Sequence, residues 1–155
     1  MLKKFIEWLG FKPYVPFQDA KASEIMVEAR RLIHIGWERK HWLGGLNEDD
    51  LSDTYSLLGA VYEACKLKTG HINDAEELVT ELAFTATNYY AHSIYDQSYE
   101  YRTKILMEFN KKAKSVDEVI ALLNRQIDYY ETEEAIKDMA DAAESAAAYL
   151  VKGDK

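Results

Sequence analysis

The chain has 155 residues, of which 48% are hydrophobic and 30% are charged, and this balance excludes a wholly disordered protein. Its net charge of −8 opposes direct binding of nucleic acid, because an acidic surface repels a polyanion. The single cysteine, Cys65, excludes an internal disulfide and a cysteine zinc site. No apolar run approaches the roughly 18 residues that a membrane span needs, so we expect a cytoplasmic protein without a span.

Glycine and proline are placed in a way that favours helices. Both prolines, Pro13 and Pro16, precede residue 20, and neither residue type occurs between Asn73 and Lys152. An all-β fold needs a turn about every 8–12 residues, and this long stretch offers none. The sequence therefore predicts an all-α fold, a single-domain helical bundle of about five to six helices over residues 19–155.

Residues 1–18 form a short N-terminal amphipathic arm with a proline-containing linker. One helical face of the arm collects four apolar residues, Leu2, Phe5, Ile6 and Leu9. Gly10 ends the predicted helix, and the prolines after it hold the chain extended. The arm folds back on the core, docks a partner or lies weakly on a membrane surface, and the sequence leaves these alternatives open.

Asp19 is the predicted N-cap of the first long helix, which runs from about Ala20 to Trp42. Gly44 and Gly45 end it. Trp37 lies on its apolar stripe and is expected in the core.

An acidic run at residues 47–50 opens the second long helix, because carboxylates are favoured in the first turn of a helix. This helix is predicted from about Asp49 to Lys68, and Gly70 closes it. Cys65 lies on the apolar stripe of the helix, and we expect it to be buried.

Asn73 and Glu76 have the spacing of a helix start, and the helix after them carries Leu78 and Leu82 on one face. A break is expected near His92 or Asp96. A further stripe then follows with helical spacing: Tyr95, Tyr99, Arg102, Leu106 and Phe109.

Ser115 and Glu118 form a capping-box pattern that opens the last predicted helix. Its apolar stripe shifts to the opposite face between Ile127 and Ile136, because nine residues correspond to a rotation of about 900°. Either the helix breaks near Glu131, or one long helix packs on two surfaces. The second face is rich in alanine and is either an intramolecular contact or a homodimer seam.

Two stretches resemble a family of small uncharacterised helical proteins found in bacteriophages and actinobacterial genomes. The first joins residues 29–37, which end in Gly-Trp, to residues 55–62, which contain Leu-Gly-Ala. The second runs over residues 105–127 and contains an aromatic-Asn pair followed by a Glu-Val-x-x-Leu-Leu helix. Together they cover about residues 29–127.

The sequence departs from the family at Phe109, where the family has Trp, and at Lys111, where it has Asp. The resemblance implies a phage-type origin, a helical domain and, for a phage-encoded protein, the cytoplasm of the host cell. It supplies no known activity and no catalytic residues.

The chain lacks the patterns that carry metal or catalytic chemistry. Glu38 and His41 have the Glu-x-x-His spacing of one half of a di-iron site, but the second half is missing. These side chains are more simply an exposed salt-bridge face, with His34 four residues before Glu38. The acidic run fails as a calcium loop, because its sixth and twelfth positions are Ser52 and Leu58. The sequence predicts no catalytic residue, no metal and no cofactor.

Tyrosine is the most unusual feature, with eleven in the chain and five between residues 89 and 101. Tyr90, Tyr101 and Tyr129 fall off the apolar stripes and are expected to be exposed. Tyrosine is enriched at protein interfaces, although packing under loops is the simpler explanation for part of the set. The candidate binding residues are Trp42, Tyr89, Tyr90, His92, Tyr95, Asp96, Tyr99, Tyr101 and Arg102.

We therefore expect a non-enzymatic phage-type accessory protein that binds a host or viral protein, as an inhibitor for example, through an acidic helical surface and a Tyr/Trp patch. Residues 1–42 carry a net charge of +3 and residues 43–155 carry −11, which suits a basic partner. One alternative is a small-molecule or catalytic domain with a Tyr/His/Asp/Arg pocket. Another is a nucleic-acid mimic that acts on a basic protein.

Overall fold

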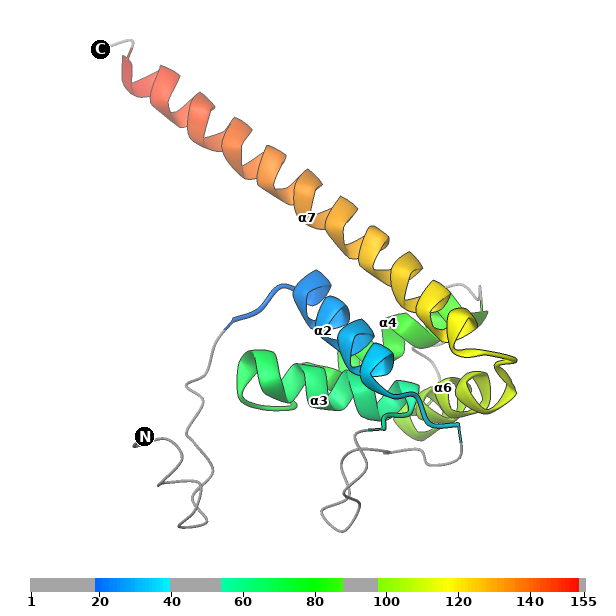
Figure 1. Cartoon of the computed structure of the whole chain (residues 1–155). Helices are drawn as coiled ribbons and strands as arrows, with labels where there is room; N and C mark the ends of the chain where they lie inside the picture. Colours follow the sequence, from blue (N-terminus) through cyan, green and yellow to red (C-terminus); the bar gives the residue numbers. More distant parts are fainter. Residues whose placement is uncertain (1–18, 40–53, 88–97, 154–155) are drawn as a thin grey trace, which may run out of the picture.

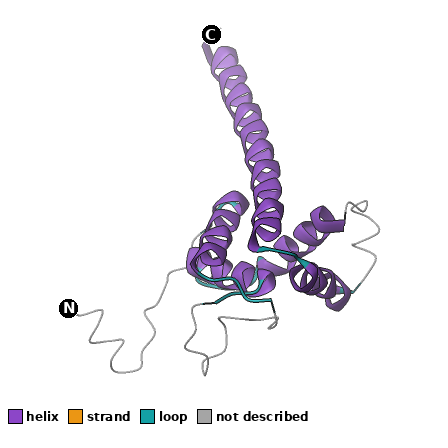
Figure 2. Ribbon diagram, turned by 45° about the vertical axis from the view of Figure 1, so that its right-hand side comes forward, coloured by secondary structure: helices purple, strands orange, loops and turns teal. Residues whose placement is uncertain are grey.

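The computed structural model describes residues 19–39, 54–87 and 98–153 (Figure 1). These residues form five helices and no strand, which confirms the predicted all-α helical bundle. The helices are α2 (Ala22–Ile35), α3 (Leu57–Thr69), α4 (Ala75–Thr87), α6 (Tyr99–Lys112) and α7 (Val116–Gly153). The predicted arm at residues 1–18 lies outside the described residues. Four helices and the first half of α7 form a body, from which the second half of α7 projects (Figures 1 and 2).

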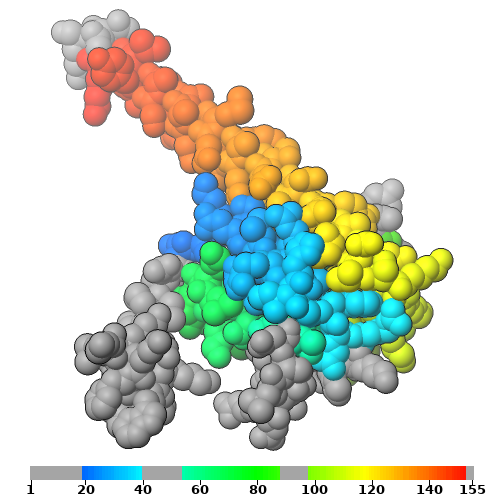
Figure 3. Space-filling view, viewed as in Figure 1, coloured from blue at the N-terminus to red at the C-terminus, as the bar shows by residue number. Residues whose placement is uncertain are grey.

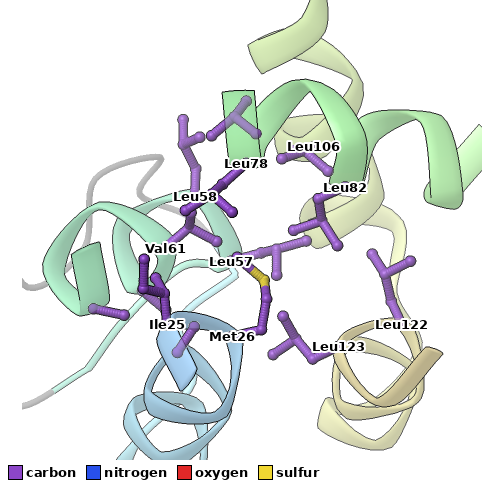
Figure 4. Packing of buried hydrophobic residues seen from close by; sticks show 14 of the residues in the cluster. Ile25, Met26, Leu57, Leu58, Val61, Leu78, Leu82, Leu106, Leu122 and Leu123 are labelled. Carbon is purple, nitrogen blue, oxygen red and sulfur yellow. The ribbon is translucent and has the colours of Figure 1, made fainter. Parts of the chain in front are cut away.

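The core lies where the four shorter helices meet the first half of α7 (Figure 4). Each helix contributes large apolar side chains that are at most 5% exposed: Ile25 and Met26, Leu57, Leu58 and Val61, Leu78 and Leu82, Leu106, and Leu122 and Leu123. Burying each such side chain stabilises the fold by about 1.5–3 kcal/mol. Cys65 is also fully buried, as predicted, and burial raises the pKa of its thiol.

α2 ends at Ile35, seven residues before the predicted end at Trp42. Gly36 adopts an extended conformation, and the chain then pairs with the segment before α3. The Tyr55 amide donates to the Gly36 carbonyl at 2.8 Å, and the Glu38 amide donates to the Tyr55 carbonyl at 2.9 Å. Backbone pairing with a distant segment therefore replaces the predicted helix at residues 36–39.

α3 begins at Leu57. The helix was predicted to begin at about Asp49, and this is wrong for Thr54, Tyr55 and Ser56, which are not helical. The Ser56 hydroxyl caps the helix by accepting from the Gly59 amide at 3.0 Å. The acidic run at residues 47–50 lies outside the described residues. The predicted end at Gly70 is confirmed, and its φ of 83° is the left-handed conformation that suits glycine.

Asn110 connects three separate segments of the body and is only 3% exposed. Its side-chain oxygen accepts from the indole of Trp37 at 2.7 Å and from the amide of Leu57 at 3.0 Å. Its side-chain nitrogen donates to the carbonyl of Glu38 at 2.9 Å. One amide group thus joins α6 to the N-terminus of α3 and to the segment after α2. Trp37 packs against the core, although it remains partly exposed.

α7 is one continuous helix of 38 residues, so of the two alternatives the break near Glu131 is wrong. Its first half buries Val119, Leu122, Leu123, Gln126, Ile127 and Tyr130. Between Glu131 and Lys152 all side chains are exposed except that of Glu134. The other alternative was a long helix that packs on two surfaces. It is correct for the face of Ile127, which packs on the body, but no described residue of this chain covers the face of Ile136.

Glu134 marks the last contact of α7 with the body. Its carboxylate accepts from the backbone amide of Ser23 at 3.1 Å and from the Ser23 hydroxyl at 2.5 Å. Ser23 lies in the first turn of α2, whose N-cap position holds Lys21 and makes no side-chain cap. The predicted cap, Asp19, is exposed and lies two residues too early. A carboxylate from α7 therefore supplies the acceptor that α2 lacks in its own sequence.

Asn110→Ala is expected to lower the free energy of unfolding by about 2–3 kcal/mol, because it leaves buried donors on Trp37 and Leu57 without an acceptor. Urea denaturation measures the change. Asn124→Ala is the matched control, since Asn124 accepts from Arg30 at the exposed surface, and it is expected to cost less than about 0.5 kcal/mol. Equal effects of the two variants would contradict the central role of Asn110.

Glu134→Ala is expected to lower the free energy of unfolding by about 1 kcal/mol, the typical value of a lost helix cap. Glu131→Ala removes the same charge three residues earlier, from an exposed position, and is the control. Thermal unfolding at low protein concentration distinguishes the two. If Glu131→Ala destabilises the fold as much as Glu134→Ala, the capping account of Glu134 is wrong.

Candidate functional site

Three of the nine candidate binding residues lie in the described part of the chain, all in the first turn of α6. The other six, Trp42, Tyr89, Tyr90, His92, Tyr95 and Asp96, lie outside it. Tyr99, Tyr101 and Arg102 follow the N-cap Ser98, whose hydroxyl accepts from the Tyr101 amide at 3.2 Å. This cap sets where the first turn of α6 begins.

Tyr99 and Arg102 face the body and hold α6 in place. The Tyr99 hydroxyl bonds to the hydroxyl of Tyr62 on α3. Burial, and in second place this contact with Tyr62, raise the pKa of Tyr99. The guanidinium of Arg102 donates to the hydroxyl of Thr80 on α4 at 3.1 Å. Both side chains therefore connect helices, and they do not line the groove described next.

Tyr101 points the other way and is 45% exposed, as predicted from its position off the stripe. It stands at the edge of a groove of about 530 Å³, formed by the end of α4, the outer face of α6 and the start of α7. We call this the α6 groove. Its apolar lining consists of Ala86, Ile105, Phe109 and Ala113. The structure thus assigns Tyr101 to a different surface from Tyr99 and Arg102.

Charged side chains surround the α6 groove. Lys104 pairs with Glu100 at 3.5 Å, and Lys112 pairs with Glu108 at 3.4 Å, both along α6. The carboxylate of Glu118 accepts from the backbone amide of Lys114 at 2.9 Å. The groove therefore has an apolar floor and a rim of compensated, solvent-exposed charges. This arrangement suits the binding of an apolar group better than the catalysis of a reaction.

Sequence reasoning missed the groove, although part of the signal was present. Tyr101, Ile105, Phe109 and Lys112 follow one another at helical spacing beside the buried stripe of α6. Phe109 was expected on that buried stripe and lies partly exposed at its edge. The contributions of α4 and α7 depend on how the helices are packed, which no local pattern gives.

Neighbouring groups cover part of Trp37, which was expected in the core. The guanidinium of Arg39 lies 5.1 Å from the ring of Trp37 and donates to the Lys114 carbonyl at 3.3 Å. The carboxylate of Glu38 accepts from the Thr54 hydroxyl at 3.0 Å. The expected salt-bridge face of His34 and Glu38 is wrong, because α2 ends between them. His41 lies outside the described residues.

A polar cluster is buried between α4 and α7. The Thr85 hydroxyl donates to the side-chain oxygen of Gln126, which is fully buried. The hydroxyl of Tyr130 lies beside the Glu81 carboxyl, but the geometry of the two groups is not that of a hydrogen bond. Burial raises the pKa of Glu81, and the charges of Glu77 and Glu133 raise it further.

The cluster serves helix packing, because its groups face one another across two helices. In the described ranges, no group of three His, Cys, Asp or Glu side chains is placed to hold a metal ion. No helix among the described residues is long and apolar enough to cross a membrane.

Comparisons of the chain with protein-family models, curated proteins and solved structures give no match. The resemblance to bacteriophage and actinobacterial proteins therefore stays a prediction from the sequence.

Glu81→Gln is expected to raise the free energy of unfolding at neutral pH, because it replaces a partly buried carboxylate with a neutral group of the same shape. The pKa of Glu81 is raised on folding, so its favourable contribution is complete below its ordinary value of 4.5 and is lost as the pH rises through the folded-state value. The advantage of the variant should therefore vanish below about pH 4.5.

Urea denaturation between neutral and acidic pH measures this difference, with the exposed Glu131→Gln as control. A benefit of Glu81→Gln that does not change with pH would contradict the assignment to titration of Glu81.

Proposed function

We propose that this chain is a non-enzymatic accessory protein, of the phage type that the sequence resemblance implies, which acts in the host cytoplasm by binding a host or viral protein. The observation that carries the proposal is the α6 groove, an apolar floor bordered by the exposed ring of Tyr101. Exposed tyrosines beside an apolar hollow are typical of interaction hot spots, because the ring offers contact area at little entropic cost.

The partner that suits the chain is a protein with a protruding apolar side chain among basic residues. The apolar side chain fits the α6 groove, whose volume is about 530 Å³. The net charge of −8 attracts a basic surface and accelerates its association, an effect that weakens with salt. Inhibition of the partner would then follow from simple occupation of its surface.

A small-molecule site is the second candidate, because about 530 Å³ falls within the usual range of about 300–1,000 Å³ for ligand pockets. The expected Tyr/His/Asp/Arg pocket receives no support from its described members, since Tyr99 and Arg102 bond to α3 and α4 instead. A ligand in the α6 groove would have to be apolar.

Mimicry of nucleic acid is favoured by a different observation. Glu131, Glu134, Asp138 and Asp141 follow one another along α7 at spacings of three, four and three residues, which aligns them in a ridge. Three of them are exposed, whereas Glu134 caps α2. Binding to a basic protein through this ridge would not depend on the α6 groove.

The uncovered stripe on the second half of α7 is a further surface for protein contact. The sequence left it as an intramolecular contact or a homodimer seam. Ile136, Met139 and Leu150 on this stripe are all exposed, and no described residue of the chain packs on them. We propose that a second protein molecule covers the stripe.

Tyr101→Ala is expected to reduce retention of a basic protein from bacterial lysate by roughly tenfold, the usual loss for a hot-spot aromatic. Tyr149→Ala, which truncates the same residue type at an exposed position on α7, is the control and should leave retention unchanged. Quantitative mass spectrometry of the bound proteins, at low and high salt, gives the readout.

Three results would overturn or redirect the proposal. Equal retention by wild type and Tyr101→Ala removes the groove from the binding account. Loss of retention with Asp138→Asn and Asp141→Asn, but not with Tyr101→Ala, favours the mimic. Absence of any retained protein, together with a rise in melting temperature on adding an apolar small molecule, favours the ligand site.

A further inference from the structure

The second half of α7 projects away from the body (Figure 3). It carries large apolar side chains that are exposed. Ile136 is 63% exposed, Met139 is 72% exposed and Leu150 is 68% exposed. Residues 131–153 extend over roughly 34 Å at the rise of an α-helix. A helical segment of this length gains little stability alone in water, so an apolar face on it calls for a partner surface.

The spacing of this face is that of a coiled-coil seam. Its members follow at intervals of four, three, four and three residues: Ile136, Ala140, Ala143, Ala147 and Leu150. The seam lies about half a turn away from the face of Ile127, which packs on the body. A helix of a second copy can therefore lie along the seam without contacting the body of the first copy. The three alanines permit a close approach of the two helix axes.

Charge determines the direction in which two copies of this helix can pair. Residues 131–141 contain five carboxylates and one lysine, a net charge of −4, whereas residues 142–152 contain one of each sign and are neutral. Parallel pairing would place −4 beside −4 along the same turns. Antiparallel pairing places each acidic half beside a neutral one, which removes most of this repulsion.

We propose that α7 forms an antiparallel pair with the α7 of a second copy of this chain, with Ala140 opposite Ala143. In this register Ile136 faces Ala147 of the other copy, so large side chains oppose small ones. At each end Leu150 meets the methylene groups of Glu133, whose carboxylate accepts from the Tyr129 hydroxyl at 2.6 Å. The pair has twofold symmetry, so every contact occurs twice.

The same register brings opposite charges together beside the seam. Lys137 of each copy lies next to Glu144 of the other, which gives two symmetric ion pairs. Met139 lies against Ala146 of the other copy on the opposite flank. In a parallel pair Lys137 would lie next to Thr132, and Glu144 next to Met139, so neither charge would meet an opposite charge on the other helix. The ion pairs therefore distinguish the two directions.

This inference rests on the proposal that a second protein molecule covers the α7 stripe, and sedimentation equilibrium of the full chain tests it. The wild type is expected to form dimers that dissociate on dilution. Ala143→Glu places a charge in the centre of the seam and should weaken association by at least about tenfold. Ala142→Glu, one residue away on the outer face of the same helix, should leave association unchanged.

Because residues 142 and 143 are both exposed in the single chain, both variants should retain the wild-type far-ultraviolet circular dichroism at low protein concentration. A wild type that stays monomeric at every concentration overturns the pairing. So does a dimer that Ala143→Glu and Ala142→Glu weaken equally.

Charge reversal tests the direction. Lys137→Glu and Glu144→Lys each convert two attractions into two repulsions and should weaken the dimer by about tenfold. The double variant restores opposite charges and should return association to within about threefold of the wild type. Rescue supports antiparallel pairing, and its absence overturns it.

The outcome is separable from that of the α6 groove. A monomeric chain that still retains a basic protein through Tyr101 overturns the pairing alone. A dimer whose retention of protein is indifferent to Tyr101→Ala overturns the groove proposal alone.

Discussion

The contact between Ser23 and Glu134 divides the molecule into its two parts. α2 has no side-chain cap of its own, and the carboxylate of Glu134 bonds to the first turn of α2 from the neighbouring helix. This contact holds α7 against α2 up to residue 134 and no further. Residues 135–152 of α7 are exposed, so the helix presents a long surface that the body does not use.

The two parts of the molecule offer different kinds of contact. In the body, Asn110 anchors α6 to the segment after α2 and to the N-terminus of α3, and Tyr99 and Arg102 hold the same helix to α3 and α4. The outer face of α6 is thereby fixed, and with it the shape of the α6 groove. The projecting half of α7 instead offers a regular seam that matches its own copy. A dimer built on this seam would carry two α6 grooves, which raises the effective concentration for a partner with repeated sites.

The sequence predicted the helical class and several local features, because these depend on neighbours along the chain. Gly70 ends a helix where expected, Cys65 is buried, and Tyr101 and Tyr129 are exposed off their stripes. The half-turn between Ile127 and Ile136 was also readable from spacing alone. Its consequence was not, because whether the helix breaks or continues into solvent depends on what the rest of the fold can cover.

The errors arise from contacts between distant residues. α2 stops early because Gly36 pairs with Tyr55 and because the indole of Trp37 bonds to Asn110, 73 residues away. The cap of α2 comes from Glu134, 111 positions away from Ser23. The local sequence pattern predicted Asp19 as the cap instead, because it contains no information about α7. The α6 groove needed three helices in place, and of its lining only Tyr101 was among the candidate binding residues.

Hydrogen–deuterium exchange along α7, measured over a series of protein concentrations, tests most directly whether this helix has one covered half and one that only a second copy covers. If a second copy covers the second half, amides of residues 119–130 are protected at every concentration, whereas those of residues 136–150 gain protection only as concentration rises. Strong protection of both halves at the lowest concentration, or fast exchange of the second half at the highest, would contradict it.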